Sequence, residues 1–385
     1  MAEQVLRCER LVTPDGVRTD ALLRIADGMI TEIGPAPSTG SGSEGAGESI
    51  DGWVLPGYVD THVHGGGGGD YPTTDPDEAL LAREFHARHG TTTSFASLVS
   101  AEPDRLVAQL ETLVPLVQRG VFAGIHLEGP FLSAAKCGAH DPALLRPPEP
   151  ELLDRLLAAG QGSIAMITIA PELEHGLAAI ERLTRAGVRV AFGHSDADER
   201  QADVAMDVGA EVATHLFNAM RSIHHRRPGP IPRLLTRDSI MVELICDGIH
   251  LHPDVIMMAI AAAGPDRVAL ITDAMNAAGL ADGPYRLGDL DVVVEQGAVH
   301  LVEPGGGIGS IAGSTLTMAD AVAFVVGLGI SIPDAARMAA TTPARRHGLD
   351  RVGELAAGRT ADLCVVDDHG RLQRVLRAGR WLENG

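Results

Sequence analysis

Eight apolar runs of strand length recur through the middle of the chain, separated by stretches with helical periodicity. The runs begin near Tyr58, Thr91, Val121, Ser163, Val188, Glu211, Ile240 and Arg267. The clearest helical patterns lie at residues 76–89, 104–119, 150–159, 173–186 and 197–208, and each is followed by a glycine. Eight strand and helix units are the number that a closed (β/α)8 barrel requires. Periodicity alone is also compatible with an open, doubly wound sheet, so the choice between the two folds depends on the polar residues.

The two ends of the chain have a different pattern, made of short β segments and turns. Residues 22–25 and 29–33 flank the turn Ala26-Asp27-Gly28 and predict a hairpin, and similar segments recur at 362–367, 374–377 and 380–381. We expect residues 1–55 and 348–385 to form one small β-sandwich domain, with an α/β TIM-like barrel at residues 56–347 inserted between them. The Gly- and Ser-rich stretch from Ser38 to Gly47 predicts a loop.

Five apolar runs end at a histidine, glutamate or aspartate. The sequences are Asp60-Thr61-His62-Val63-His64, His126-Leu127-Glu128, Phe192-Gly193-His194, Ala213-Thr214-His215 and Ile271-Thr272-Asp273. The carboxyl ends of the strands are where a (β/α)8 barrel assembles an active site, and these residue types bind divalent metals. The pattern therefore favours the barrel and predicts a metal-dependent hydrolase.

The candidate ligands form two sets. His62 and His64 are two residues apart on a strand, so both imidazoles face the same side, although such a pair also arises by chance. Glu128 ends a buried strand, where a carboxylate needs a metal or an arginine partner. With His194 and His215, Glu128 makes a set of two imidazoles and one carboxylate that leaves a coordination position open.

Asp273 follows the eighth apolar run and is predicted to be a general acid and base beside the metal. The alternative role is a helix N-cap, which aspartate often serves. Between Asp273 and Ser314 the segments 290–294 and 298–302 predict a β-hairpin over the site.

Composition limits the possible partners. The net charge of −20 argues against a nucleic acid or an anionic membrane as partner. The four cysteines are scattered, the N-terminus has no signal-peptide pattern, and the longest apolar stretch, 255–263, is far shorter than the ~20 residues that span a bilayer. We expect a soluble cytoplasmic protein.

Aromatic residues make up only 3% of the chain, so aliphatic side chains must fill the core.

The ordered motifs resemble those of the amidohydrolase superfamily over nearly the whole chain. They are Pro56-Gly57-Tyr58-Val59-Asp60, His126-Leu127-Glu128-Gly129-Pro130-Phe131, Gly193-His194-Ser195, Thr214-His215-Leu216-Phe217-Asn218-Ala219-Met220, Asp247-Gly248-Ile249-His250, Thr272-Asp273-Ala274, Gly313-Ser314-Thr315-Leu316-Thr317-Met318 and Pro343-Ala344-Arg345. The resemblance implies hydrolysis of N-acetyl-D-glucosamine 6-phosphate to D-glucosamine 6-phosphate and acetate. The alternatives are N-acetylgalactosamine 6-phosphate as substrate, or a non-catalytic barrel that binds a sugar phosphate.

The resemblance also assigns roles to individual residues. It implies that Glu128, His194 and His215 bind metal and that Asp273 is the catalytic acid and base. The positions that match substrate-binding residues are Ala139, His140, Asn218, Ala219, Arg226, His250, Ile311, Ala312 and Gly313. Among them, His250 is expected to polarise the acetyl carbonyl. Arg226 is expected to receive the phosphate, in a homodimer where it reaches the neighbouring subunit's site. On spacing alone, Arg226 would belong to a solvated basic loop.

The sequence leaves three features of the site open: the number and identity of the ions, the bridging residue and the role of Cys137. The site holds one or two ions of Zn, Fe, Mn or Co, because such ligands accept all four. Related enzymes bridge two metals with a carboxylated lysine on the fourth strand, but the run at 163–170 has no lysine and the single Lys136 lies in a loop. Glu128 is then the candidate bridge, with His62 and His64 holding a second ion. Cys137 could contact substrate, bind a metal as thiolate, or be incidental.

Overall fold

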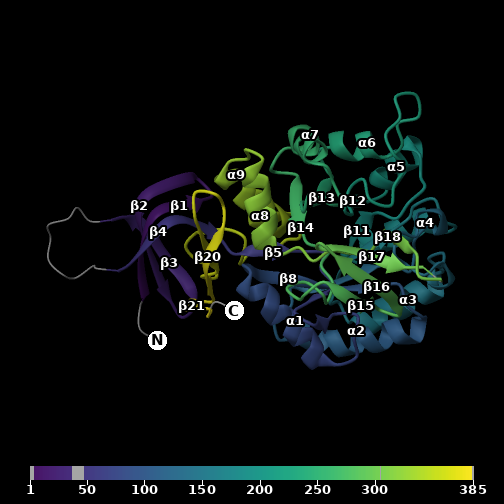
Figure 1. The fold of residues 1–385 in the computed structure, drawn as a ribbon, viewed down its shortest axis with the longest axis horizontal. Helices are drawn as coiled ribbons and strands as arrows, with labels where there is room; N and C mark the ends of the chain where they lie inside the picture. The colour runs from purple at the N-terminus through teal and green to yellow at the C-terminus, as the bar shows by residue number, and fades with distance from the viewer. Residues whose placement is uncertain (1–3, 37–46, 304, 384–385) are drawn as a thin grey trace. The chain divides into compact units, whose positions relative to one another are not determined.

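The computed structural model describes residues 4–36, 47–303 and 305–383, so most of the predicted loop from Ser38 to Gly47 lies outside the described residues. The chain forms two compact units (Figure 1). One contains Met1–Asp60, His86–Thr93 and Met318–Gly385, and the other contains Thr61–Phe85 and Ser94–Thr317. The domain boundaries expected from the sequence, at residues 55 and 348, stay a prediction.

An eight-stranded sheet follows the order of the chain and forms the barrel. Its strands are β5 (Tyr58–Asp60), β8 (Thr91–Val99), β9 (Gly124–Glu128), β10 (Ile164–Ile169), β11 (Arg189–Phe192), β12 (Ala210–Ala213), β13 (Met241–Ile245) and β14 (Val268–Ile271). Neighbouring strands from β8 to β14 pair in parallel. Each begins within a few residues of its predicted start, with the largest shift at β9. The predicted TIM-like barrel is therefore confirmed.

Two backbone hydrogen bonds join the first and last strand ends of the barrel. The N–H of Asp273 donates to the carbonyl of His62 at 2.9 Å, and the N–H of His64 donates to the carbonyl of Ala274 at 2.8 Å. These bonds bring the first and eighth strand ends, far apart in sequence, to the same place. The pairing therefore sets the histidine pair beside Asp273.

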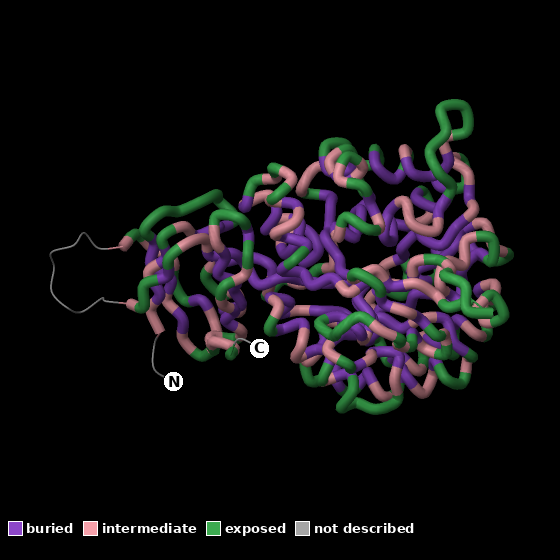
Figure 2. Tube along the Cα trace, viewed as in Figure 1, coloured by how far each residue is buried: buried purple, intermediate pink, exposed green. Residues whose placement is uncertain are grey.

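Helices alternate with the strands through the barrel, as the periodicity predicts, and the last helices follow one another after the inserted strands. The helices are α1 (Pro76–Arg88), α2 (Pro103–Gln118), α3 (Pro150–Gly160), α4 (Gly176–Arg185), α5 (Glu199–Asp207), α6 (Ile231–Thr236), α7 (Pro253–Ala263), α8 (Met318–Gly327), α9 (Ile332–Ala336) and α10 (Thr342–Arg346). Two short 3-10 helices, η1 (Ala134–Lys136) and η2 (Pro142–Leu144), and one π-helix, η3 (Arg337–Thr341), complete the set. Asp198 starts α5 because its side chain accepts from the N–H groups of Arg200 and Gln201, in a capping box. The barrel strands are buried, and the outward helix faces are exposed (Figure 2). Among the described residues, none of these helices has the length and apolar character needed to cross a bilayer.

Both chain ends contribute to one seven-stranded sheet, as predicted. Its order is β21 (Arg380–Trp381), β20 (Leu372–Arg377), β19 (Leu363–Val366), β4 (Glu48–Pro56), β1 (Gln4–Thr13), β2 (Gly16–Ala26) and β3 (Met29–Pro35). The predicted hairpin is formed by β2 and β3, with Leu23 opposite Ile33. Leu6, Leu23, Leu363 and Leu376 are fully buried in one core, so residues from opposite ends of the chain hold this sheet together.

A four-stranded antiparallel sheet is inserted after β14. It consists of β15 (Gly283–Leu287), β16 (Leu290–Glu295), β17 (Ala298–Val302) and β18 (Ile308–Ile311). The predicted hairpin is its central pair, β16 and β17, and two further strands extend it. Its buried side packs Val292, Val294 and Ala312 against Met275. Two minimal strands, β6 (Gly65–Gly66) and β7 (Gly69–Asp70), form a separate small ribbon.

Candidate active site

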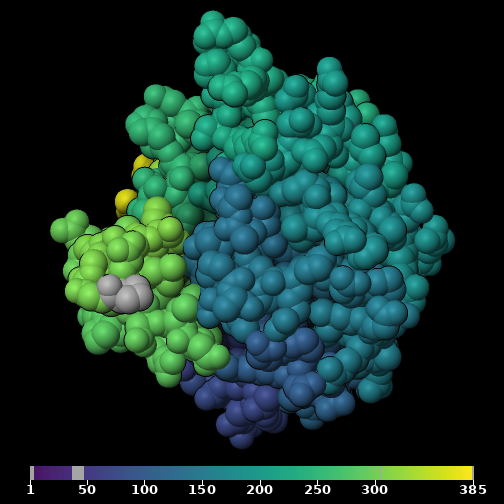
Figure 3. Space-filling model, turned by 90° about the vertical axis from the view of Figure 1, so that its right-hand side faces the viewer, coloured from purple at the N-terminus to yellow at the C-terminus, as the bar shows by residue number. Residues whose placement is uncertain are grey.

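A pocket of about 600 Å³ opens at the carboxyl ends of the barrel strands. Its lining includes His64, Glu128, His194, His215 and Asp273. The loop around residues 138–144 and the inserted sheet at 287–290 and 310–313 form other parts of the wall. Figure 3 shows the yellow-green surface of the inserted sheet bordering the blue surface of the segments before residue 150. The size suits a small-molecule ligand.

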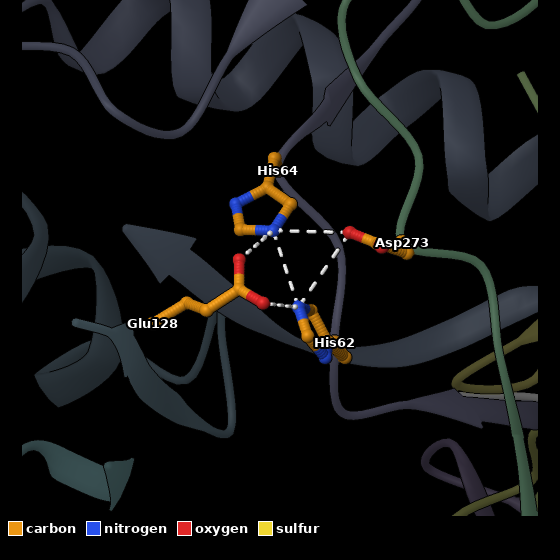
Figure 4. A group of neighbouring side chains, drawn as sticks. All are labelled: His62, His64, Glu128 and Asp273. Carbon is orange, nitrogen blue, oxygen red and sulfur yellow. Dashed lines mark hydrogen bonds and ion pairs between the residues drawn. The ribbon is translucent and has the colours of Figure 1, made fainter. Parts of the chain in front are cut away.

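Two groups of candidate metal ligands meet at Glu128. His62, His64, Glu128 and Asp273 form one group (Figure 4), and Glu128, His194 and His215 form the other; within each group the ligand atoms lie within 4.8 Å of one another. Oε1 of Glu128 is 3.0 Å from Nε2 of both His194 and His215. Oε2 of Glu128 is 3.2 Å from Nε2 of His64. Oε1 also lies 3.5 Å from Nε2 of His62, so the carboxylate of Glu128 lies between the two groups, where it could bridge them.

Three of the histidine rings make a hydrogen bond through Nδ1, and this contact turns Nε2 of each ring toward the candidate ligand groups. Nδ1 of His64 lies 3.2 Å from the carbonyl oxygen of Ser97, and Nδ1 of His194 lies 2.9 Å from that of Lys136. A carbonyl can only accept, so in both rings Nδ1 carries a proton and Nε2 is free to bind a metal. Nδ1 of His62 faces the carboxylate of Glu243 at 3.2 Å in the same way. This is the arrangement by which proteins orient histidine ligands.

The spacing of the inward atoms fits a bound cation. Nε2 of His62 and Nε2 of His64 are 3.2 Å apart, and Nε2 of His194 and Nε2 of His215 are 3.0 Å apart. Ligands at ~2.1 Å around a tetrahedral ion lie roughly 3.4 Å from one another. Lone pairs of neutral imidazoles and carboxylates repel at such distances unless positive charge lies between them. Both groups therefore fit a divalent cation.

The shifted pKa values of His64 and Asp273 also indicate that positive charge is favoured between these side chains. Burial disfavours a charged His64, but hydrogen bonds and charges from Asp273 and Glu128 overcome it and raise the pKa of His64 to about 9. Burial opposes the ionised form of Asp273, yet His62 and His64 hold the pKa of that carboxyl below its usual range. In the absence of an ion, protons take the role that a metal would fill.

Three strand-end residues reach the site through unusual backbone conformations. His194, His215 and Asp273 have φ values of 47°, 26° and 50°. Left-handed geometry costs a non-glycine residue about 1–3 kcal/mol and tends to occur at functional sites. Gly313, at φ 68°, lies so close that a Cβ there would be 3.0 Å from the carbonyl oxygen of Asp273. The absence of a side chain at Gly313 lets the chain pass beside the proposed acid and base.

Most of the predicted substrate-binding residues line the pocket. They are Ala139, His140, Asn218, Ala219, His250, Ile311 and Gly313. Ala312 lies instead in the core beneath the inserted sheet, with no exposed surface. Arg226 is exposed on the projecting loop between β12 and α6 and is outside the pocket lining (Figure 1). Among the described residues, Cys137 belongs to neither ligand group nor to the lining, and it forms no disulfide.

His250 has a partner that the sequence interpretation did not single out. Oδ2 of Asp247 lies 2.6 Å from Nδ1 of His250, and Oδ1 of Asp247 accepts from the N–H groups of Ile249 and His250 at 2.8 Å. Burial opposes ionisation of Asp247, but His250 holds the pKa of this carboxyl below its usual range. With Nδ1 held, Nε2 of His250 is the nitrogen available to a ligand. The three-residue spacing between Asp247 and His250 in Asp247-Gly248-Ile249-His250 could have indicated this contact from the sequence.

Other side chains at the site were also missed. Glu243 lies behind His62, and Arg105 lines the pocket, where its Nη1 is 2.6 Å from Oδ2 of Asp289. A glutamate inside the apolar run Met241-Val242-Glu243-Leu244-Ile245 could have been recognised as costly to bury. Nothing in the sequence around Arg105 distinguishes it from an ordinary surface arginine.

A barrel with clustered histidines and carboxylates at its strand ends, able to hold a divalent cation, is typical of metal-dependent hydrolases. The model of the amidohydrolase family matches residues 53–382, and the chain belongs to that family.

Individual relatives agree with this assignment. An N-acetylgalactosamine-6-phosphate deacetylase of Escherichia coli O157:H7 is 38% identical, over 98% of each chain. An N-acetylglucosamine-6-phosphate deacetylase of Lysinibacillus sphaericus is 35% identical, over 88% of this chain and 86% of its own. A solved structure of the Mycobacterium smegmatis N-acetyl-D-glucosamine-6-phosphate deacetylase, a mutant in complex with N-acetyl-D-glucosamine 6-phosphate, is 41% identical with a TM-score of 0.92, over 99% of each chain.

Proposed function

We propose that this protein hydrolyses N-acetyl-D-glucosamine 6-phosphate to D-glucosamine 6-phosphate and acetate. The observation that carries the proposal is the pair of candidate ligand groups that share Glu128, one of which includes Asp273, in the lining of a pocket large enough for a sugar. The similarity to deacetylases that act on phosphorylated amino sugars supports the choice of substrate.

Each side chain has a role in amide hydrolysis. Asp273 takes a proton from the attacking water and later donates a proton to the departing amine nitrogen as the C–N bond breaks. His250, held by Asp247, polarises the acetyl carbonyl through Nε2 and stabilises the negative charge that develops on its oxygen. His140 is buried beside Glu128, with its Nε2 3.5 Å from Oε2, and this contact orients its ring toward the pocket.

The cofactor in this proposal is one or two divalent ions of Zn, Fe, Mn or Co. Glu128, His194 and His215 would hold one ion, and His62, His64 and Asp273 with Glu128 would hold a second. A bound divalent cation polarises a carbonyl and lowers the pKa of a coordinated water to about 7. Imidazole and carboxylate ligands do not discriminate strongly among these metals.

We further propose a cytoplasmic homodimer in which Arg226 binds the phosphate in the partner's pocket. Arg226 is exposed next to Arg227, His224 and His225, so this loop can present a planar, bidentate donor to an anion. In the partner's pocket, Asn218 and Ala219 would supply the remaining phosphate contacts. The four cysteines are free, in line with a reducing compartment.

A mixture of two impaired variants, one with a raised KM and one with a lowered kcat, tests this use of Arg226. Arg226→Ala is expected to raise KM for the phosphorylated sugar more than it lowers kcat, because the residue contacts only the phosphate. When Arg226→Ala subunits exchange with Asp273→Asn subunits, activity at low substrate should exceed that of either variant alone. Only mixed dimers then contain an active site that combines an intact Asp273 in one subunit with an intact Arg226 from the other. Unchanged activity after proven subunit exchange would mean that Arg226 acts within its own subunit or not at all.

Acetate release from the purified protein tests the reaction itself. N-acetyl-D-glucosamine 6-phosphate, N-acetyl-D-galactosamine 6-phosphate and unphosphorylated N-acetyl-D-glucosamine should be compared, each with and without a chelator. We expect the largest kcat/KM for the glucosamine derivative. The galactosamine derivative is the second candidate, because a relative with 38% identity carries that name. Binding without acetate release from any of them would support a non-catalytic sugar-phosphate-binding barrel.

A further inference from the structure

Glu243 is a buried carboxylate directly behind the proposed metal site. It lies in the middle of β13, and 0% of its surface is exposed. Both oxygens point at residues that follow β5: Oε2 lies 3.2 Å from Nδ1 of His62, and Oε1 accepts from the hydroxyl of Thr61 at 3.3 Å. An ionised carboxylate so deeply buried is costly unless it meets a compensating charge or strong donors.

The contact with Glu243 determines which ring nitrogen of His62 faces the proposed metal site. His62 is itself fully buried, and its Nε2 lies 3.5 Å from Oε1 of Glu128 and 3.6 Å from Oδ1 of Asp273. A proton held on Nδ1 by Glu243 leaves Nε2 as the ligand nitrogen. The negative charge of Glu243 also increases the electron density of the ring, which strengthens binding to a cation.

The surroundings leave the His62 ring little room to turn. The ring of His126 stands edge-on to it at 4.5 Å between centroids, and His126 is in turn fixed by Ser97 at 3.0 Å and Thr168 at 2.8 Å. The carboxylate of Glu243 therefore lies on the Nδ1 side of a His62 ring that is held in place from more than one direction.

We propose that Glu243 is a positioning residue that sets the affinity of the His62 and His64 group for a divalent ion. This rests on the proposed function only in taking the two ligand groups as metal sites. The group of Glu128, His194 and His215 does not depend on Glu243 in the same way, because Nδ1 of His194 is held by the carbonyl of Lys136. Loss of Glu243 should therefore weaken one position and spare the other.

Zn²⁺ titration of metal-free protein, with a competing chromophoric chelator, tests the proposal. Wild-type protein is expected to bind two ions per subunit. In Glu243→Ala the affinity of one position should fall by roughly 10- to 100-fold, the usual effect of removing such an outer carboxylate. Glu243→Gln keeps hydrogen bonds to His62 and Thr61 but loses the charge, so its effect should be smaller in the same direction. The remaining position should keep its wild-type affinity, and His62→Ala should lose the same position as Glu243→Ala.

Glu211→Gln is the matched control, because Glu211 lies on the adjacent strand β12 and pairs with Arg189 at 2.7 Å, away from the ligands. It should bind two ions as tightly as wild type. The proposal is overturned if both Glu243 variants titrate like wild type. It is also overturned if both positions weaken together with a fall in the unfolding temperature of the metal-free protein, which would show a purely structural role.

The titration needs no substrate, so it is independent of the proposed reaction. Normal acetate release with unaltered Zn²⁺ binding in the Glu243 variants would remove the role of Glu243 and keep the function. If the Glu243 variants lost one Zn²⁺ position selectively but the wild-type protein released no acetate, the role of Glu243 would stand and the proposed reaction would fail.

Discussion

Asp273→Asn is expected to lower kcat for acetate release by roughly 10²- to 10⁴-fold, the range for losing a general acid and base. Asparagine preserves the size of the side chain but can neither take a proton from water nor give one to the amine. The Oδ1 atom of Asp273 is 3.2 Å from Nε2 of His64, so the substitution should also weaken the ion in the His62 and His64 group. The ion at Glu128, His194 and His215 should remain.

Steady-state rates combined with metal analysis separate these two effects. Supplying excess metal should restore the ion content of Asp273→Asn without restoring the rate. Asp207→Asn serves as control, since Asp207 is an exposed residue at the end of α5 that pairs with Arg237. A metal-saturated Asp273→Asn enzyme with a near-normal rate would exclude Asp273 as the acid and base.

Glu128→Gln should have the most severe effect on metal content, because Glu128 is the one residue common to both ligand groups among the described residues. A neutral amide cannot bridge two cations, and its N–H₂ group would face imidazole nitrogens or metal on one side. We expect both ions to bind much more weakly. The rate should fall by more than the roughly 10²- to 10³-fold that loss of one charge-stabilising donor costs.

Metal analysis after dialysis, together with the rate at saturating Zn²⁺, measures this outcome. Glu211→Gln is again the matched control, because it makes the same change on a barrel strand outside the ligand groups. His194→Ala is the informative comparison and should lose one ion of the two. If Glu128→Gln retained both ions, Glu128 would not be the bridge between them.

The candidate metal ligands could be predicted from the sequence because of two simple regularities. Strand periodicity places His62 and His64 on the same face, and a parallel barrel gathers every strand's carboxyl end at one rim. His194 and His215 therefore had to be neighbours once their strands were recognised as consecutive. The fold class followed from the alternation of strands and helices together with the polar residues at the strand ends, and the structure confirms it.

The residues behind the ligands were not predicted, because their role depends on which strand they face. Glu243 and His126 interrupt apolar runs, but the run does not reveal that one lies behind His62 and the other beside it. The carbonyl of Lys136 acts through the backbone, which leaves no trace in residue identity. For Ala312 the prediction failed in the other direction, because a residue expected at the pocket does not line it. Its neighbours Ile311 and Gly313 line the pocket, while Ala312 faces the core.

The sequence by itself determined the eight strand and helix units, the five strand ends with candidate metal ligands and the position of Asp273, because periodicity and strand ends are local properties of the chain. Only the tertiary structure decided how these candidate ligands divide into two groups. The hydrogen bonds between Asp273 and His62 and between His64 and Ala274 join the first strand end to the last. They place Asp273 in one ligand group with the histidine pair, and they leave Glu128 shared between that group and His194 with His215. Such groupings depend on contacts between residues more than 200 positions apart in the chain, as from His62 to Asp273, which no local pattern encodes.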